Sequence, residues 1–207
     1  PLGRPYEPPF QPTVAKYTDN YIIMMSASKM FSYAGQRIAV LAISDRLYNR
    51  EYPALQERYA IGRLGDALVL GVLYAVSSGT SHSAQHALAA MFKAAADGQL
   101  DFVADTSEYA RRAALTKKMF IDNGFHIVYS KDGDEDVSDG FFYTVGYKDM
   151  SGAVLMRELM LTGICSISLS LTGSAQAGVR ICVSQLNRPE QLDLLENRLG
   201  LFASSHP

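Results

Sequence analysis

The sequence predicts an α/β protein. Two short apolar runs, at residues 21–25 and 38–43, have the length and composition of strands buried on both faces. Longer stretches with helical periodicity follow them, and strand patterns alternate with helices in the second half of the chain. Apolar residues make up 48% of the 207 residues, which is enough for a hydrophobic core in a chain of this length.

In the first half, the two strands enclose a loop with a glycine and precede a series of helices. The helices are expected at residues 45–59, 61–76 and 81–96. The second of them is so apolar that we expect other parts of the protein to bury it. Residues 1–12 are rich in proline, which disfavours both helix and paired strand, so they are expected to form a loop.

The second half is expected to hold a long helix and a small sheet with covering helices. Helices are predicted at residues 101–123, 151–161 and 189–201, and strands at 125–129, 141–147 and 179–184. The acidic segment 131–139 is expected to be a solvated hairpin loop. Its Asp-x-Asp pattern does not continue with the glycine and terminal glutamate of a calcium loop, so metal binding is not expected there. The start of the long helix divides the chain into two expected domains, residues 1–100 and 101–207.

Composition argues against several classes of partner. The formal net charge of -2 gives no electrostatic support for nucleic-acid binding. No apolar run approaches the length of a membrane span, so no membrane association is expected. Cys165 and Cys182 lack metal-ligand spacing and do not suggest a disulfide framework, which favours reduced thiols and a cytoplasmic location. No metal site is expected.

Residues 26–37 carry the groups best suited to catalysis. Lys29 follows a predicted strand, at a kind of position where α/β sheets bind ligands. A lysine sheltered from water attacks a carbonyl as a neutral amine. The hydroxyls of Ser26 and Ser28, with the guanidinium of Arg37, offer donors for a phosphate. A solvent-exposed lysine beside turn-forming serines is the simpler alternative, and the short motif alone would favour it.

The longer string resembles the lysine signature of the class I/II aminotransferases, which are fold-type I pyridoxal-phosphate enzymes. That signature is Ser-x-Ser-Lys, a short loop with a glycine, and an arginine eight positions after the lysine; its positions are filled here by Ser26, Ser28, Lys29, Gly35 and Arg37. The resemblance implies that Lys29 forms the Schiff base with pyridoxal 5'-phosphate and moves the substrate Cα proton. It also implies that Ser26 and Arg37 hold the cofactor phosphate, with Ser28 as a further contributor.

A second segment resembles the strand on which this family carries the arginine that binds the substrate α-carboxylate. Arg180 occupies the matching position, and Gly163 with Ile164 resembles the glycine-isoleucine entry to the family's variable active-site strand. Guanidinium and carboxylate pair bidentately, which would orient the substrate. From the alternation with Val179 and Ile181 alone, Arg180 would be assigned to the polar face of an edge strand.

Three further features have two interpretations each. Residues 79–85 resemble a helix start that reaches the cofactor phosphate of a neighbouring subunit in this family, but an ordinary N-cap is favoured. His82 and His86 lie four residues apart, and without a third ligand they are better explained as surface or interface histidines. Tyr33 either lines the pocket or packs in the core.

The resemblance covers nearly the whole chain, as the second half of a family member. It implies a truncated sheet with helices, the C-terminal part of the cofactor-binding large domain, followed by a small α/β C-terminal domain. It further implies a homodimer that acts on an amino acid and a 2-oxo acid. The family's upstream groups, including the Asp that protonates the pyridine nitrogen, would precede Pro1, so we expect an aminotransferase fragment that is inactive alone. The alternatives are another fold-type I reaction, such as carbon-sulfur β-elimination, and a non-catalytic C-terminal domain that dimerises.

Overall fold

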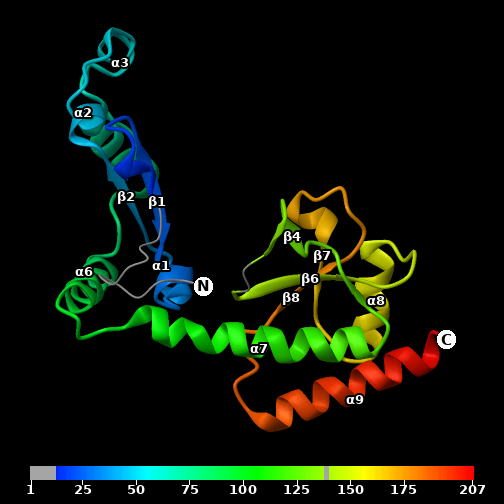
Figure 1. Cartoon of the computed structure of the whole chain (residues 1–207). Helices are drawn as coiled ribbons and strands as arrows, with labels where there is room; N and C mark the ends of the chain where they lie inside the picture. Colours follow the sequence, from blue (N-terminus) through cyan, green and yellow to red (C-terminus); the bar gives the residue numbers. More distant parts are fainter. Residues whose placement is uncertain (1–12, 138–139) are drawn as a thin grey trace. The chain divides into compact units, whose positions relative to one another are not determined.

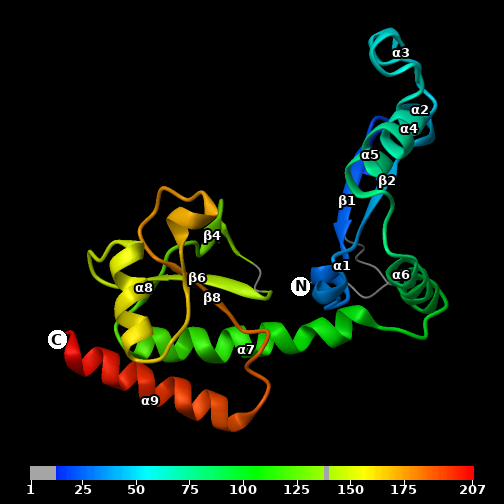
Figure 2. The same cartoon turned by 180° about the vertical axis from the view of Figure 1, so that it is seen from behind.

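The computed structural model describes residues 13–137 and 140–207, and the loop expected at residues 1–12 lies outside them. The chain divides into two compact units (Figures 1 and 2). The N-terminal unit ends at Val103, and the C-terminal unit runs from Ala104 to Pro207. In the described residues, no helix is both long enough and apolar enough to cross a membrane.

The N-terminal unit is built on a two-stranded antiparallel sheet. Strand β1 (Ile22–Ser26) pairs with β2 (Ala39–Ile43), so that Ser26 lies opposite Ala39. Between the strands are two short helical turns, α1 (Ala27–Met30) and η2 (Ala34–Gln36). The other elements are η1 (Val14–Lys16), α2 (Asp45–Tyr48), α3 (Pro53–Tyr59), α4 (Leu64–Asp66), the π-helical segment η3 (Ala67–Tyr74), α5 (Ala75–Ser77) and α6 (His82–Ala96).

The prediction that both strands are buried on both faces is wrong for the described residues. Exposure alternates along each strand: Met24 is 82% exposed and Leu41 is also exposed, whereas Met25 and Val40 are half-buried. The covered face contacts a small core that includes residues of the loop and of α6, namely Ala27, Ile38, Ala84 and Leu88. An apolar strand is buried on both faces only where other parts of the protein cover both faces of its sheet. Among the described residues, only one face of the β1–β2 sheet is covered.

Two helical predictions for this unit need correction. The helix expected at residues 45–59 is two helices, because Pro53 lacks an amide hydrogen and begins α3 at its first turn. The apolar helix expected at residues 61–76 forms as consecutive α4, η3 and α5, but it is not buried. Leu70, Tyr74 and Val76 are all more than half exposed, so the described residues do not provide the expected cover.

The C-terminal unit contains a four-stranded antiparallel sheet in the order β3-β6-β8-β7. Its strands are β3 (His126–Ile127), β6 (Phe142–Gly146), β7 (Ile167–Ser168) and β8 (Val179–Cys182). Its helices are α7 (Phe102–Asp122), whose first residues precede the unit boundary, α8 (Gly152–Leu161), η4 (Leu169–Thr172) and α9 (Pro189–Ser205). The α7 and α8 predictions are confirmed, and Gly124 and Gly163 follow them with the positive φ that glycine tolerates.

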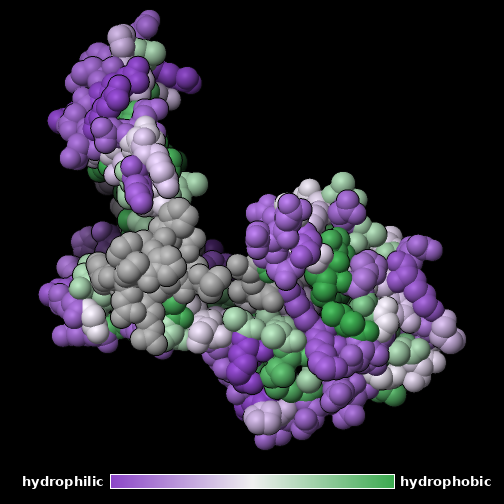
Figure 3. Space-filling model, viewed as in Figure 1, coloured by the Kyte–Doolittle hydropathy of each residue, from purple (hydrophilic) through white to green (hydrophobic). Residues whose placement is uncertain are grey.

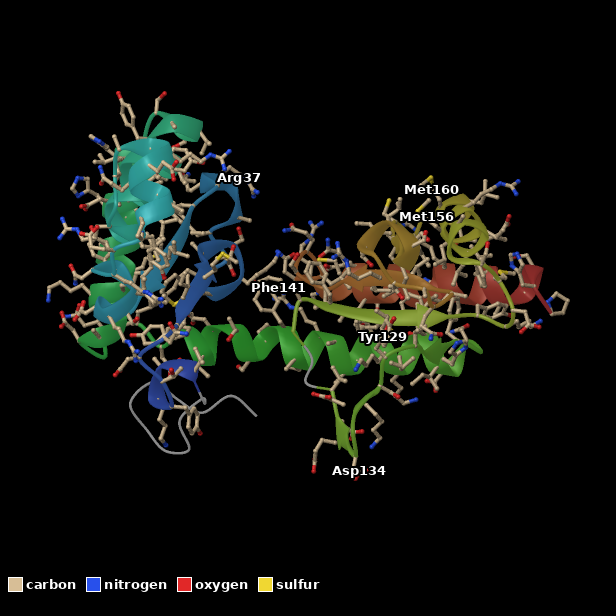
Figure 4. The ribbon with its side chains drawn as sticks, turned by 90° about the horizontal axis from the view of Figure 1, so that it is seen from above. Arg37, Tyr129, Asp134, Phe141, Met156 and Met160 are labelled. Carbon is tan, nitrogen blue, oxygen red and sulfur yellow. The ribbon has the colours of Figure 1, made fainter. Side chains whose placement is uncertain are left out.

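The acidic segment forms a small exposed hairpin, as predicted. Strands β4 (Lys131–Asp132) and β5 (Glu135–Asp136) pair with each other, and Asp134 lies at the tip (Figure 4). Lys131 and Asp136 form an ion pair at 2.6 Å across the hairpin, and this contact lowers the pKa of the Asp136 carboxyl. The described residues of the hairpin are all exposed.

One hydrophobic core holds the C-terminal sheet against its helices. Alternate residues of β8 point into this core, so Val179 and Ile181 are buried while Arg180 is half-buried and Cys182 is exposed. Within this core, the largest fully buried side chains come from the helices and are Phe120, Leu155, Leu159, Leu199 and Phe202. Away from the core, Figure 3 shows hydrophobic residues on the surface near β7, where Ile167 and Leu171 are exposed.

Helix α9 offers a matched test of this core. Replacing Leu199, which is 0% exposed, with alanine should lower the free energy of unfolding by about 2–5 kcal/mol, because a cavity replaces buried methyl groups. The same change at Leu201, which is 65% exposed on the same helix, should cost about 0.5 kcal/mol or less. Denaturant unfolding measures both; equal losses would contradict the packing of α9.

An ion-pair cluster on α7 predicts a pH dependence. Glu108 accepts hydrogen bonds from Arg111 at 2.7 Å and from Arg112 at 3.0 Å, and Arg112 also donates to the carbonyl of Ser184 at 3.4 Å. The two guanidinium hydrogen bonds lower the pKa of Glu108 from 4.5 to about 2. Because the folded pKa is the lower one, the stability that ionised Glu108 contributes is present above its unfolded pKa and is lost as pH falls toward about 2.

The stability difference between the native chain and Glu108→Gln should therefore be constant near neutral pH. It should shrink as the pH falls from about 4.5 to about 2, and denaturant unfolding across this range would measure it. Glu196→Gln, at an exposed position on α9, is the matched control and should show a smaller change over the same range. A Glu108→Gln difference that persists unchanged at pH 2 would contradict the assignment.

Candidate functional site

The groups of the predicted lysine site lie together at the closed end of the β1–β2 hairpin. Ser26 ends β1 and is the N-cap of α1, which carries Ser28 and Lys29. Arg37 lies just before β2. Ser26 pairs with Ala39 and the Ala27 amide donates to the Ile38 carbonyl at 3.3 Å, so this pairing closes the loop of residues 28–37. Strand pairing therefore gathers all four groups in one loop.

The backbone of this loop is fixed from within. The amides of Phe31 and Tyr33 both donate to the Ala27 carbonyl at 3.1 Å. Beneath the loop, the buried side chains of Ala27 and Ile38 belong to the small core that includes α6 residues. Tyr33 packs against this core, and Phe31 meets the ring of Phe92 edge-on at 5.3 Å. Of the two interpretations of Tyr33, the described contacts therefore favour packing in the core.

Arg37 has an unusual conformation for a non-glycine residue. Its φ of 52° is left-handed, which costs on the order of 1–2 kcal/mol. Its Nη1 donates to the Ala34 carbonyl at 2.9 Å, which holds the side chain beside its own loop (Figure 4). A guanidinium has five N–H donors, so this bond leaves donors with which Arg37 could bind an anion. Strain at a functional loop is a recognised means of presenting a side chain in a fixed position.

The exposure of the site differs from the sequence expectation. Ser26, Lys29 and Arg37 are exposed and Ser28 is half-buried, so the described residues do not form the sheltered lysine pocket. The chemical groups of these four residues are nevertheless of the types that bind pyridoxal phosphate. Ser26 caps α1 without a side-chain hydrogen bond to that helix, which leaves its hydroxyl to a ligand. The loop thus offers two hydroxyls and a guanidinium for a phosphate, and an amine for an aldehyde.

Arg180 belongs to the C-terminal unit, and the edge-strand interpretation for it is wrong. Strand β8 is an interior strand, in which Arg180 has Thr144 of β6 on one side and Ile167 of β7 on the other. Its guanidinium carbon lies 4.2 Å from the ring centroid of Phe142, a cation–π contact that supports the side chain from one side. The arginine is therefore presented on the sheet face opposite the core.

Two weaker predictions concern residues at the start of helix α6. Ser81 is its N-cap residue by position but makes no side-chain cap; its Oγ is instead 3.1 Å from the Oγ of Ser83. His82 and His86 are both exposed in the first turns. Among residues 13–137 and 140–207, no group of three or more His, Cys, Asp or Glu side chains could hold a metal ion.

Sequence reasoning missed two features of the C-terminal unit. One is the support of Arg180 by Phe142, which depends on the register between β6 and β8. The other is a cavity of about 250 Å³ whose wall includes Phe120, Arg198 and both cysteines. Neither has a local signal in the sequence, because each joins residues from segments that pairing brings together. Knowledge of strand register would have been needed to find them.

Comparison with known proteins adds information on the fold. No protein-family model and no curated protein matches the chain. Among solved structures, the chain is similar to L-threonine-O-3-phosphate decarboxylase from Porphyromonas gingivalis, with a TM-score of 0.53 and 16% sequence identity. The match covers 91% of this chain and 48% of that chain, so this chain spans about half the length of that neighbour.

At this level of identity, the likeness shows a shared fold alone. The α/β class predicted from the sequence is confirmed, since both units mix helices with strands. The fold is one that this decarboxylase also uses over part of its length. The boundaries 1–100 and 101–207, and the roles assigned to those two domains, stay predictions.

Proposed function

We propose that this chain is the lysine-bearing and carboxylate-binding part of a pyridoxal-phosphate-dependent aminotransferase. The observation that carries the proposal is the gathering of Ser26, Ser28, Lys29 and Arg37 in one strand-paired loop, at the spacing of the class I/II lysine signature. The fold shared with part of an amino-acid decarboxylase supports the broader class of enzyme. The substrates would be an amino acid and a 2-oxo acid.

Each residue has a distinct chemical task in this proposal. When bound, pyridoxal phosphate supplies an electron sink for the carbanion that forms at the substrate Cα. Arg37 and the serine hydroxyls bind the phosphate through charge-assisted hydrogen bonds. Lys29 would hold the cofactor at its aldehyde group, and its amine would take up and give back a proton at the substrate Cα. Arg180, supported by Phe142, pairs with the substrate α-carboxylate.

The exposed apolar surface supports assembly with more polypeptide. The helix formed by α4, η3 and α5 and the outer face of the β1–β2 hairpin expose large apolar side chains, and contiguous surfaces of this kind commonly mark interfaces. The two-stranded sheet also has unpaired outer edges among the described residues, which favour pairing with another strand. We propose a homodimer and, as the sequence suggests, a cytoplasmic location.

Decarboxylation is a second candidate, because the structural neighbour is named as an amino-acid phosphate decarboxylase. Decarboxylation breaks the bond from Cα to the carboxylate that Arg180 is proposed to bind, whereas transamination breaks the bond from Cα to hydrogen. The lysine loop serves either reaction, and also β-elimination at a carbon-sulfur bond. Product analysis with an amino acid separates them: only transamination yields a 2-oxo acid together with the amine form of the cofactor.

The aldehyde of pyridoxal phosphate should attach preferentially to Lys29. After borohydride reduction, peptide mass mapping should find the cofactor on Lys29, and Lys29→Ala should remove that label. Lys93→Ala is the matched control, because Lys93 is an exposed lysine of the same unit that pairs with Asp97 at 2.6 Å. Label spread evenly over exposed lysines would contradict the site and support the alternative of a non-catalytic domain that dimerises.

The proposed binding of the cofactor phosphate by Arg37 leads to a second prediction for the same loop. Arg37→Ala should weaken cofactor attachment by about 10- to 100-fold in apparent affinity, since a charge-assisted hydrogen bond contributes about 1.5–3 kcal/mol. Pyridoxal without its phosphate should attach equally to both proteins. Titration of the attached cofactor by absorbance measures both values. An equal loss with and without the phosphate would indicate that Arg37→Ala only distorts the loop.

A further inference from the structure

Two cysteines that are distant in the sequence lie on adjoining segments of the C-terminal sheet. Strand β7 pairs antiparallel with β8, with Ile167 opposite Arg180. The ladder ends there, and Cys165 and Cys182 each lie two residues beyond that pair. Both cysteines are exposed, and both border the cavity of about 250 Å³.

The backbone is held on either side of each cysteine. Ahead of Cys165, the amides of Gly163 and Ile164 donate to carbonyls of α8 at 2.9 and 2.8 Å, and the β7 ladder begins two residues after the cysteine. Cys182 pairs with Phe142 of β6, and the next amide, that of Val183, donates to the Phe141 carbonyl at 3.0 Å. The backbone next to each cysteine is therefore held in place by α8 or by the sheet.

The register suits a disulfide. The Leu169 amide donates to the Gly178 carbonyl at 3.0 Å in this register, so every second pair along the ladder is of the hydrogen-bonded type, including Ile167 with Arg180, the last pair before the cysteines. Such pairs have Cα atoms about 5.5 Å apart. Disulfides join Cα atoms roughly 4.4–6.8 Å apart. The chain has two cysteines in total, so neither has another partner within the chain.

We propose that Cys165 and Cys182 form a dithiol site that closes reversibly to a disulfide by exchange with a small disulfide such as oxidised glutathione. The thiolate of one cysteine attacks the small disulfide and releases one glutathione thiol. The second cysteine then displaces the other glutathione from the mixed disulfide. Two protein thiols are oxidised, and one small disulfide is reduced to two thiols. The hydroxyl of Ser184, 3.1 Å from Cys182 Sγ, is placed to donate to a thiolate there.

The site has a consequence for Arg180. Residues 180 and 182 point to the same face of β8, because side chains alternate along a strand. The closed disulfide thus lies beside the guanidinium and fixes β7 to β8 on the face that presents it. An effect of oxidation on amino-acid binding rests on the proposed function, whereas the formation of the disulfide does not.

The test is a thiol count on the whole chain. Incubation with oxidised glutathione should lower the titre of free thiols from two per chain to none, and intact mass should show the loss of two hydrogens with no added glutathione. Peptide mapping without reduction should recover the Cys165 and Cys182 peptides joined, and dithiothreitol should restore both thiols. Two stable glutathione adducts per chain, or covalent dimers in place of the intrachain bond, would overturn the proposal.

Single substitutions supply the control. Cys165→Ser and Cys182→Ser should each retain one glutathione, because the mixed disulfide lacks the second thiol that resolves it. Phenylarsine oxide gives a measure of proximity without oxidation, since its arsenic binds two thiols and releases water. It should block both thiols of the native chain and be displaced readily from either single variant. Equal retention by native and single-cysteine proteins would show that the thiols do not converge.

Discussion

The antiparallel register of β1 with β2 is the constraint on which the lysine site depends. It brings Ser26 opposite Ala39 and Ala27 next to Ile38, and so closes the loop that carries Ser28, Lys29 and Arg37. A shift of one residue would turn every side chain of a strand to the other face. The buried pair Ala27 and Ile38 opposes such a shift, because both belong to the small core that includes Ala84 of α6, which is fully buried. The lysine loop is thus held by packing beneath it.

Register has the same role in the C-terminal unit. Side chains alternate between the two faces of β8. Val179 and Ile181 point into the core, so Arg180 points to the opposite face. Pairing with β6 places Phe142 under the guanidinium, and pairing with β7 extends toward the cysteines. An arginine on an interior strand, with neighbours on both sides, can move less than one on an edge. That restriction suits a group whose proposed task is to orient a carboxylate.

Local signals predicted what depends on local chemistry. The glycines after α7 and α8, the proline at the start of α9, and the strand-loop-strand context of Lys29 were all visible in the sequence. Pro53 itself indicated a break between α2 and α3, but the helical periodicity of the apolar residues led to the prediction of one helix. Strand register and the support of Arg180 by Phe142 could not be predicted, because they join segments whose pairing no local pattern encodes.

The errors about burial have one physical origin, and it bears on the chemistry. Apolar composition shows that Met24 and Val76 are suited to contact with protein, but not which polypeptide covers them. Met24 and Ser26 are two residues apart on β1 and point to the same face. A layer of protein that buried Met24 would therefore also approach the Ser26 hydroxyl, which is proposed to bind phosphate, and would enclose the neighbouring lysine loop. Shelter from water favours the uncharged amine that a lysine nucleophile needs, which is the role proposed for Lys29. One covering layer of protein would therefore bury the exposed apolar face and also shelter the lysine.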